Sequence, residues 1–578
     1  MQQKPISCLH TDVLVIGAGG AGMSAALAAA QAGRRVLLAD RSLIGRGGAT
    51  IMAQMTVAAA LGAQVEDHWR HHYADTLKAG RGLCNEALAR VLCEEGVDAI
   101  RLLDSWDVGW ARKDGRLAQV QAPGHDRPRC VYVDILNTGP AVAQTLRTRV
   151  AREELVRRVG DLLICELLLQ DGRVVGALAL HLDSGEPVLI GASATIIATG
   201  GLTRLYRRNS ASLNMGGDGF ALALRAGAAL IDMEFVQFFP IGHLAPRLVG
   251  FDPIMWDPFR YKLGGRLLNG NEEEFVSRYD NDAKRDGYTT TRDAATYAIL
   301  KEVEAGRGTP AGGAWLSFRH LPEAALREGF GPVIDKLLAN GIDLTRSMIE
   351  VAPIAHYHMG GIRVDTDLAT DVPGLYAAGE AVGGANGANR LSGNAITEAI
   401  VFGLRAGRSA ARADAHVTSS AALQALAGPL LAELRQTQPG GTEAAPAALL
   451  TQLQDVMQDY VGPFRTDAGL TEALRRLCHL RAALGPALPG GTGPQDPTRL
   501  DALDLRNMLL VAEAVTRSAL ARQESRGAHQ REDFPEQDDA WTVNQAISLR
   551  NGHWVLARQP VARLPDHELA SDNVGAHQ

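Results

Sequence analysis

The sequence predicts an α/β fold, in which a domain built on a parallel sheet is interrupted by an α+β capping domain and followed by a C-terminal helical bundle. Three observations support this prediction. A strand–helix–strand pattern opens the chain, a glycine-rich α/β pattern returns near residue 356, and Leu and Ala recur at helical spacing after residue 416. With 578 residues, the chain is long enough for several domains and a large core.

The first β-α-β unit lies at the N-terminus. Residues 13–16 form an apolar run closed by glycine, which is typical of a strand buried on both faces of a parallel sheet. The Ala-rich residues 21–32 predict a helix that ends at Gly33, and residues 35–39 predict the next strand. A later apolar run, 194–198, is expected to return to the same sheet.

A glycine pattern lies between that first strand and helix, where a dinucleotide-binding fingerprint requires it. Gly17 allows the tight turn, Gly19 lets the backbone approach a pyrophosphate, and Gly22 lets helix and strand pack closely. Asp40 ends the second strand, and its carboxylate can accept hydrogen bonds from a ribose diol. We therefore expect a Rossmann-like dinucleotide site, with Gly20 among its lining residues.

A second glycine-rich segment indicates that the dinucleotide is FAD and not NAD. Residues 375–380 form a short strand that ends in Gly-Glu, and residues 389–394 open a helix. A second helix N-terminus directed at the same ligand suits a long molecule with a ribityl chain and an isoalloxazine end. The sequence therefore predicts FAD as the cofactor.

Several short motifs follow the fingerprint in a specific order, and with them the chain resembles a known family. It is similar to the flavoprotein subunits of succinate dehydrogenase and fumarate reductase, with L-aspartate oxidase and the adenylylsulfate reductase flavoprotein as relatives. The likeness spans nearly the whole chain. The motifs are Ala198-Thr199-Gly200-Gly201, Gly217-Asp218-Gly219, Met233-Glu234-Phe235-Val236-Gln237-Phe238, His356-Tyr357-His358-Met359-Gly360-Gly361, Gly387-Ala388-Asn389-Arg390-Leu391 and Glu524-Ser525-Arg526-Gly527-Ala528-His529.

Composition marks the domain boundaries. Residues 241–349 change to Pro, Trp, Arg, Asp and Tyr with few long apolar runs, which predicts the capping domain. This domain divides the Rossmann-like FAD-binding domain into residues 1–240 and 350–415. Segments at helical spacing assign 416–525 to a C-terminal helical domain, and the polar residues 526–578 are expected to form an irregular tail.

The resemblance implies how the cofactor is held. Glu380 would bind the sugar chain of FAD, and Asn394 would lie at the flavin end. The serine that usually follows this asparagine is Ala395 here, so Ser392 is a candidate substitute donor. The expected cofactor-binding set is completed by Gly200 and Asp218.

The resemblance also implies the reaction and its residues. Hydride passes between flavin N5 and a carboxylate-bearing substrate, which requires cations to hold the carboxylate and a group to move a proton. Arg390 and His356 resemble the carboxylate clamp, and Arg292 resembles the arginine that transfers the proton. Because an arginine releases its proton only above a pH of about 12, Arg292 needs a relay such as Asp293 or has only an electrostatic role.

Four departures from the family pattern concern the cofactor and substrate pockets. Ala49 stands where many members carry the histidine that links the flavin, so FAD is expected to be bound noncovalently. Met55-Thr56 replaces a Gly-Gly at a loop that approaches the flavin. Phe239 replaces a substrate-binding histidine, and Asp257-Pro258 replaces a Thr-Glu, so one carboxylate anchor is expected to be lost and the substrate need not be succinate.

Composition excludes several other functions. The net charge of -7 and the absence of a basic stripe argue against nucleic-acid binding. The six scattered cysteines predict no iron–sulfur cluster, and no metal site is expected, since His68, His72 and Asp75 are predicted to lie on a solvated helix face. Without a signal segment or an apolar stretch of about 18 residues, the chain is expected to be cytoplasmic and to reach a membrane only through a partner subunit.

The electron acceptor stays open at this point. Electrons would leave through an iron–sulfur subunit or a ferredoxin, or pass directly to oxygen or a small acceptor. Two other functions stay open besides that of a dehydrogenase subunit, namely a soluble oxidase resembling L-aspartate oxidase and a flavin-bearing regulatory component.

Overall fold

The computed structural model describes residues 6–134, 136–246, 248, 254–256, 263–279, 292–435, 445–488 and 497–565, with only the backbone described at 292, 293 and 435. The chain divides into two compact units. The first comprises Met1–Arg207, Ala211–Phe235 and His358–Gln578, and the second comprises Arg208–Ser210 and Val236–Tyr357.

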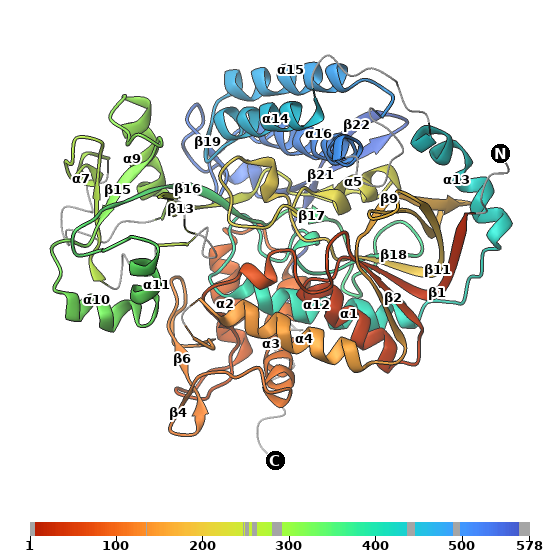
Figure 1. The fold of residues 1–578 in the computed structure, drawn as a ribbon, viewed down its shortest axis with the longest axis horizontal. Helices are drawn as coiled ribbons and strands as arrows, with labels where there is room; N and C mark the ends of the chain where they lie inside the picture. Colours follow the sequence, from red (N-terminus) through yellow and green to blue (C-terminus); the bar gives the residue numbers. More distant parts are fainter. Residues whose placement is uncertain are drawn as a thin grey trace. The chain divides into compact units, whose positions relative to one another are not determined.

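The first unit is built on the predicted α/β sheet, which confirms the fold class. Strand β1 pairs in parallel with β2 on one side and with β11 on the other, and β18 also pairs in parallel with β11 (Figure 1). Strands β9 and β10 extend the sheet in antiparallel pairing. The strand bounds are β1 Ser7–Ile16, β2 Val36–Ala39, β8 Val156–Val159, β9 Leu162–Gln170, β10 Arg173–His181, β11 Pro187–Ile197 and β18 Leu375–Ala377.

The apolar run at 13–16 is only the second half of β1, because the strand begins at Ser7. Most of its first six residues are polar and five of the six are exposed or half-buried, so the sequence pattern detected only the buried part. The run at 194–198 covers the last four residues of β11 and the residue after it, directly beside β1, as predicted. The parallel strands β1, β2, β11 and β18 therefore end on one edge of the sheet, where a ligand binds in folds of this kind.

Two helices pack tightly on this sheet through small residues. Helix α1 (Gly20–Gln31) lies against α12 (Asn394–Ala411), which comes from the second glycine-rich segment. A Cβ at Gly403 would lie 2.4 Å from the carbonyl oxygen of Ala21, and one at Gly407 would lie 2.3 Å from that of Ala25. Only glycine permits this approach, so the two distant segments are fixed against each other.

Helices α14, α15 and α16 form the predicted C-terminal helical region, with α13 preceding them (Figure 1). Thr466 caps α15 by accepting a hydrogen bond from the N–H of Gly469, and Gly485 follows its last turn with φ of 74°. The helix bounds are α13 Ser420–Arg435, α14 Pro446–Tyr460, α15 Asp467–Leu484 and α16 Pro497–Ala521.

The predicted irregular tail is wrong for its first part. Strands β21 (Val543–Arg550) and β22 (His553–Pro560) form a hairpin that pairs with β12 (Leu230–Ile231). Apolar and polar residues are mixed without a regular period, since β21 buries Asn544 and Gln545 beside Ala546 and Ile547 and β22 is largely exposed. The Asn-Gly pair at 551–552, where both φ angles are positive, is the turn signal that could have identified the hairpin.

The second unit is a small α+β body, as predicted for the capping region. Its sheet has the order β13-β16-β15-β14, in which β15 pairs antiparallel with both β14 and β16. Beside it, the rings of Trp256 and Phe330 lie 5.8 Å apart and those of Phe318 and Phe330 lie 5.4 Å apart, measured between ring centroids. The element bounds are β13 Val236–Ala245, β14 Arg266–Leu268, α7 Val276–Tyr279, α9 Arg292–Glu304, β15 Ala314–Ser317, α10 Glu323–Phe330, α11 Val333–Ala339 and β16 Ile349–His358.

In the described ranges, no helix combines the length and the apolar character that crossing a membrane requires.

Candidate functional site

Glycine is needed at the three fingerprint positions for different structural reasons. A Cβ at Gly17, where φ is 101°, would lie 2.4 Å from the carbonyl oxygen of Ala198. A Cβ at Gly22 would lie 1.8 Å from the carbonyl oxygen of Gly17. Both positions are therefore closed by the backbone of the fold itself.

Gly19 instead borders open space. Among the described residues, and apart from its chain neighbours, the only atom within 4 Å of a Cβ at this position is Thr50 Oγ1, at 3.8 Å. The neighbouring Gly20 donates its N–H to the same Thr50 Oγ1 at 3.0 Å. Since the N-terminus of α1 carries partial positive charge, the open face at Gly19 is suited to a pyrophosphate.

Asp40 lies at the end of β2, and the chain itself already holds its carboxylate. Oδ2 accepts the N–H of Ala18 at 2.6 Å, and Oδ1 accepts both the N–H and the hydroxyl of Ser42 at 2.8 Å. A carboxylate offers about four acceptor positions, so capacity remains for a ribose hydroxyl. These contacts orient the carboxylate before a ligand binds.

The second glycine-rich segment meets the first within the same unit. A Cβ at Gly379, where φ is 65°, would lie 2.7 Å from the Cβ of Ala21 in α1. A Cβ at Gly201 would lie 2.3 Å from Oε1 of Glu380. A Cβ at Gly200, where φ is 75°, would lie 2.7 Å from the sulfur of Met215.

Glu380 is a buried carboxyl beside these glycines. Its Oε1 accepts the N–H of His358 at 3.1 Å. Burial raises the pKa of Glu380 to about 8, although the His358 N–H and the positive charge of Arg390 lower it in part. The carboxyl is therefore mostly protonated at neutral pH and can donate a hydrogen bond to a sugar hydroxyl.

Asp218 has partners that the sequence did not reveal. One of its oxygens accepts from Arg41 at 2.9 Å, and the other accepts from Asn507 of α16 at 2.9 Å. The same Arg41 donates to Asp504 at 2.9 Å. The side chain of Asp218 thus joins the start of α5 (Asp218–Arg225) to the C-terminal helices.

Asn394 and Ser392 lie at the start of α12, and their partners were also missed. The Asn394 Oδ1 lies 2.7 Å from Nε2 of His72, and its Nδ2 donates to Thr76 Oγ1 at 3.2 Å. The carbonyl oxygen of Ser392 lies 2.6 Å from Nε2 of His125. The prediction of a solvated face is wrong for His72, which is fully buried.

Helix α2 (Trp69–Ala79) explains that error, because it buries His72, Tyr73 and Thr76 on one side. His72 and Thr76 are four residues apart, so the spacing itself was the available signal. Among the described residues, no group of three or more His, Cys, Asp or Glu side chains is arranged to hold a metal ion.

The catalytic candidates fall in both units. Arg390 belongs to the first unit and is 7% exposed, and its guanidinium NH1 lies 3.4 Å from the carbonyl oxygen of Leu391. His356 belongs to the second unit, and its Nδ1 lies 2.8 Å from Ser210 Oγ. Arg292 begins α9, and its side chain lies outside the described residues, as do those of Asp293 and the Asp257-Pro258 pair.

The structure describes the surroundings of Phe239 and Ala49, two of the residues that depart from the family pattern. The Phe239 ring meets the His356 ring edge to face, with centroids 4.3 Å apart, and packs with Met255 and Ile354. Ala49 precedes a short 3-10 helix and has no side-chain atom that could bond covalently to a flavin.

The neighbouring Met55 is held by helix α4. The carbonyl oxygen of Met55 accepts from the Thr138 hydroxyl at 2.5 Å, at the start of α4 (Thr138–Arg152). This loop is thereby seated in the first unit.

Comparisons with known proteins agree over most of the chain. A family model described as "FAD binding domain" matches residues 12–396, and one described as "Fumarate reductase flavoprotein C-term" matches residues 450–563. The chain is 37% identical over 533 residues to one subunit of the fumarate reductase (CoM/CoB) of Methanothermobacter marburgensis, covering 92% of this chain and 95% of that one.

It is 33% identical over 549 residues to L-aspartate oxidase of Streptomyces coelicolor, covering 94% of this chain and 92% of that one. Among solved structures, Mycobacterium smegmatis Sdh1 in complex with UQ1 matches with a TM-score of 0.88 at 34% identity, covering 98% of this chain and 97% of that one.

Proposed function

Because the chain belongs to the family of fumarate reductase and succinate dehydrogenase flavoprotein subunits, we propose that it exchanges hydride with a substrate carrying one carboxylate and passes the electrons to a separate protein. It is an FAD-dependent oxidoreductase. The bound FAD supplies the two-electron chemistry, and the protein supplies binding, orientation and control of protons.

The glycine geometry fits FAD. The backbone closes the positions of Gly17 and Gly22, whereas Gly19 leaves room at the N-terminus of α1 for a pyrophosphate. Glu380 offers a buried, mostly protonated carboxyl to the sugar chain, and Asp40 offers an oriented carboxylate to the ribose. We propose that the FAD is noncovalent, because Ala49 has no reactive side-chain atom.

Three residues are proposed to act on the substrate. Arg390 and His356 bind its carboxylate, and Arg292 acts at the carbon that gains or loses the proton. The hydrogen bond between His356 Nδ1 and Ser210 fixes the ring orientation. An imidazole oriented in this way presents its other nitrogen, Nε2, in a defined direction, which suits recognition of one carboxylate oxygen.

The observation that carries the substrate assignment is the edge-to-face contact between Phe239 and His356, at 4.3 Å between ring centroids. Phe239 belongs to an apolar cluster with Met255 and Ile354 in the second unit. A second carboxylate placed against this cluster would lose hydrogen bonds to water without gaining a donor, which costs about 1 to 3 kcal/mol. We therefore propose a substrate with a single carboxylate and an apolar or neutral group beside it.

Anaerobic flavin spectra test this proposal. Saturated monocarboxylates are expected to bleach the oxidised holoprotein, and unsaturated ones to reoxidise the reduced holoprotein, at lower concentrations than succinate and fumarate. The Phe239→His variant is expected to shift the preference toward dicarboxylates by about 5- to 150-fold, which corresponds to about 1 to 3 kcal/mol. The control is Phe534→His, at a ring that is 36% exposed in the other unit, and it is expected to behave like the parent.

Two outcomes would contradict the proposal. If no carboxylate changes the flavin spectrum, and His356→Ala and Arg390→Ala behave like the parent, a regulatory flavoprotein is the better description. If the purified chain turns over in air and releases peroxide, it is an oxidase that needs no carrier protein.

We further propose that the electrons pass to an iron–sulfur subunit or a ferredoxin. The six cysteines are all free, and three of them, Cys84, Cys93 and Cys130, are buried. We place the protein in the cytoplasm, where free thiols persist, with any membrane association made through the partner subunit. Reduction of an added ferredoxin by substrate and holoprotein together, but by neither alone, tests the transfer.

A further inference from the structure

The turn that opens α12 is held at four successive residues. A Cβ at Gly124, where φ is 91°, would lie 2.8 Å from Leu391 Cδ1, so this turn and the loop around Gly124 are in close contact. The next three residues of the turn are held by hydrogen bonds. Ser392 is bonded to His125 at 2.6 Å, Gly393 accepts the N–H of Ala58 at 3.0 Å, and Asn394 is bonded to His72 at 2.7 Å.

Both histidines act as hydrogen-bond donors. The Ser392 carbonyl oxygen can only accept, so Nε2 of His125 carries the proton. Asn394 directs its Nδ2 to Thr76, so its Oδ1 accepts from Nε2 of His72. Burial lowers the pKa of both imidazoles, to about 3 for His72, so each ring is neutral at pH 7.

The rings make few other polar contacts. In the described part of the chain, neither Nδ1 atom has a hydrogen-bond partner. The two rings lie 6.0 Å apart between centroids, and Nε2 of His125 is also 3.6 Å from Cys130 Sγ. Among the described residues, the hydrogen bonds of the two rings are thus made to the turn and to Cys130.

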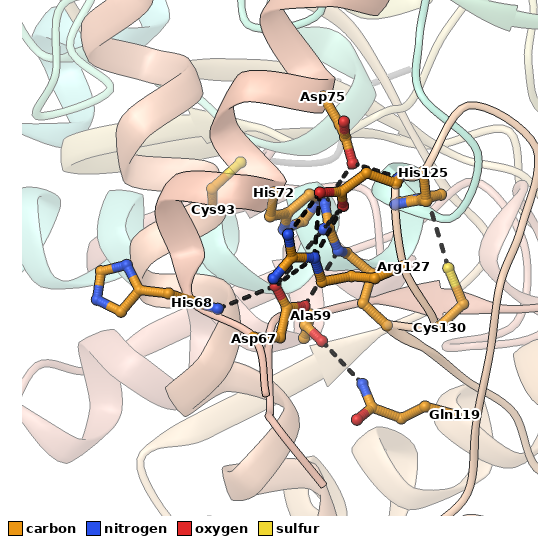
Figure 2. Close-up of polar contacts among 12 residues, drawn as sticks. Ala59, Asp67, His68, His72, Asp75, Cys93, Gln119, His125, Arg127 and Cys130 are labelled. Atoms are coloured by element: carbon orange, nitrogen blue, oxygen red, sulfur yellow. Dashed lines mark hydrogen bonds and ion pairs between the residues drawn. The ribbon is translucent and has the colours of Figure 1, made fainter. Parts of the chain in front are cut away.

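An ion cluster centred on the buried Arg129 joins the two segments that carry these histidines. The guanidinium of Arg129, with 0% side-chain exposure, lies 3.2 Å from Asp67 and 2.8 Å from Asp75, and it also contacts Asp126. Asp75 accepts the N–H of Asp126 at 2.9 Å. Figure 2 shows Asp67 and Asp75 of this cluster, with His72 and His125 close to them.

Asp67 and Asp75 belong to residues 67–79, which contain α2 and are called the α2 arm here. Asp126 and Arg129 belong to the loop that carries His125. This loop continues into β7 (Cys130–Val131), which pairs with β3 (Val57–Ala58), and Ala58 in turn holds Gly393. The α2 arm, the loop and β3 therefore surround the turn together.

We propose that His125, together with His72, is a positioning residue for the flavin, holding turn 391–394 so that the N-terminus of α12 is directed at the isoalloxazine end. The inference rests on the proposed function for the direction in which α12 points. Neither histidine touches the substrate in this proposal. Their role is to fix the helix start that carries Asn394 and follows Arg390.

The test compares two amides of different reach in the holoprotein. In His125→Gln, the longer side chain brings an N–H to the Ser392 carbonyl, whereas in His125→Asn it is too short. For His125→Asn we expect amide hydrogen exchange in residues 391–397 to accelerate about tenfold or more, and the visible circular dichroism of the flavin to change. For His125→Gln both properties are expected to stay close to those of the parent. With a substrate in hand, kcat is expected to fall in His125→Asn with KM nearly unchanged.

A matched control is His71→Asn, at an exposed residue of the same helix as His72, and it is expected to match the parent. The pair His72→Gln and His72→Asn provides the same comparison in α2. This pair tests the proposal if His125→Asn does not fold. Parental exchange and flavin dichroism in the Asn variants would overturn the proposal, as would equal changes in the Gln and Asn variants. Exchange and dichroism need no substrate, so they remain decisive even if no carboxylate reacts and the proposed function fails.

Discussion

The fingerprint glycines allow fold and cofactor binding to be separated by two substitutions. Gly19→Ala adds a methyl group whose nearest neighbour is Thr50 Oγ1 at 3.8 Å, at a residue with φ of -74°, which alanine adopts readily. Its effect on the free energy of unfolding is therefore expected to be within about 1 kcal/mol. Gly22→Ala instead places a methyl group 1.8 Å from a carbonyl oxygen, which forces α1 away from β1 and is expected to cost roughly 3 kcal/mol or more.

The same methyl group at Gly19 occupies the space that the pyrophosphate needs. Losing one backbone hydrogen bond to a charged phosphate oxygen costs about 1.5 to 3 kcal/mol, which weakens FAD binding by about 10- to 150-fold. Titration of flavin-stripped protein with FAD measures the affinity, and denaturant unfolding of the same samples measures stability.

Opposite patterns are expected for the two variants. Gly19→Ala is expected to keep the parental unfolding midpoint and lose FAD affinity, whereas Gly22→Ala is expected to lose stability first. If Gly19→Ala is stable and binds FAD as the parent does, the pyrophosphate does not lie at Gly19. If Gly19→Ala is destabilised as much as Gly22→Ala, a methyl group at position 19 does not have open space around it.

Three further predictions concern charge and cofactor retention. Because the pKa of His72 is lowered from 6.5 to about 3 in the fold, the unfolded chain binds more protons between these values, and stability falls with decreasing pH. Between pH 7 and pH 5, the free energy of unfolding of His72→Gln is therefore expected to fall by about 2 kcal/mol less than that of the parent. Equal decreases for the two proteins in denaturant unfolding would contradict this. Arg41→Met leaves Asp218 and Asp504 without this shared cation and is expected to lower the free energy of unfolding by about 3 kcal/mol, whereas an unchanged midpoint would show that their other partners suffice. Acid precipitation is expected to leave all FAD in the supernatant, and flavin in the pellet would reveal a covalent bond.

Local patterns were sufficient for the first β-α-β unit and for the cofactor. The apolar strand, the spacing of Gly17, Gly19 and Gly22, and the acidic residue after β2 all lie within about thirty residues, where backbone geometry restricts the choices. The α+β character of the inserted region was predicted from its composition, and the C-terminal helices from the helical spacing of Leu and Ala. The hairpin at 543–560 was missed because its strands bury few apolar residues.

The sequence by itself thus determined the fold class, the family and the identity of the cofactor, because these depend on short-range spacing and on ordered motifs. Only the tertiary structure decided what the individual side chains do. It paired Asp218 with Asn507 across 289 residues and His72 with Asn394 across 322. It also showed that Gly19 alone among the three fingerprint glycines borders open space. The physical reason is that hydrogen bonding and burial of a polar side chain are set by residues that are distant in the chain, and the choice of such partners leaves no periodic pattern in the sequence.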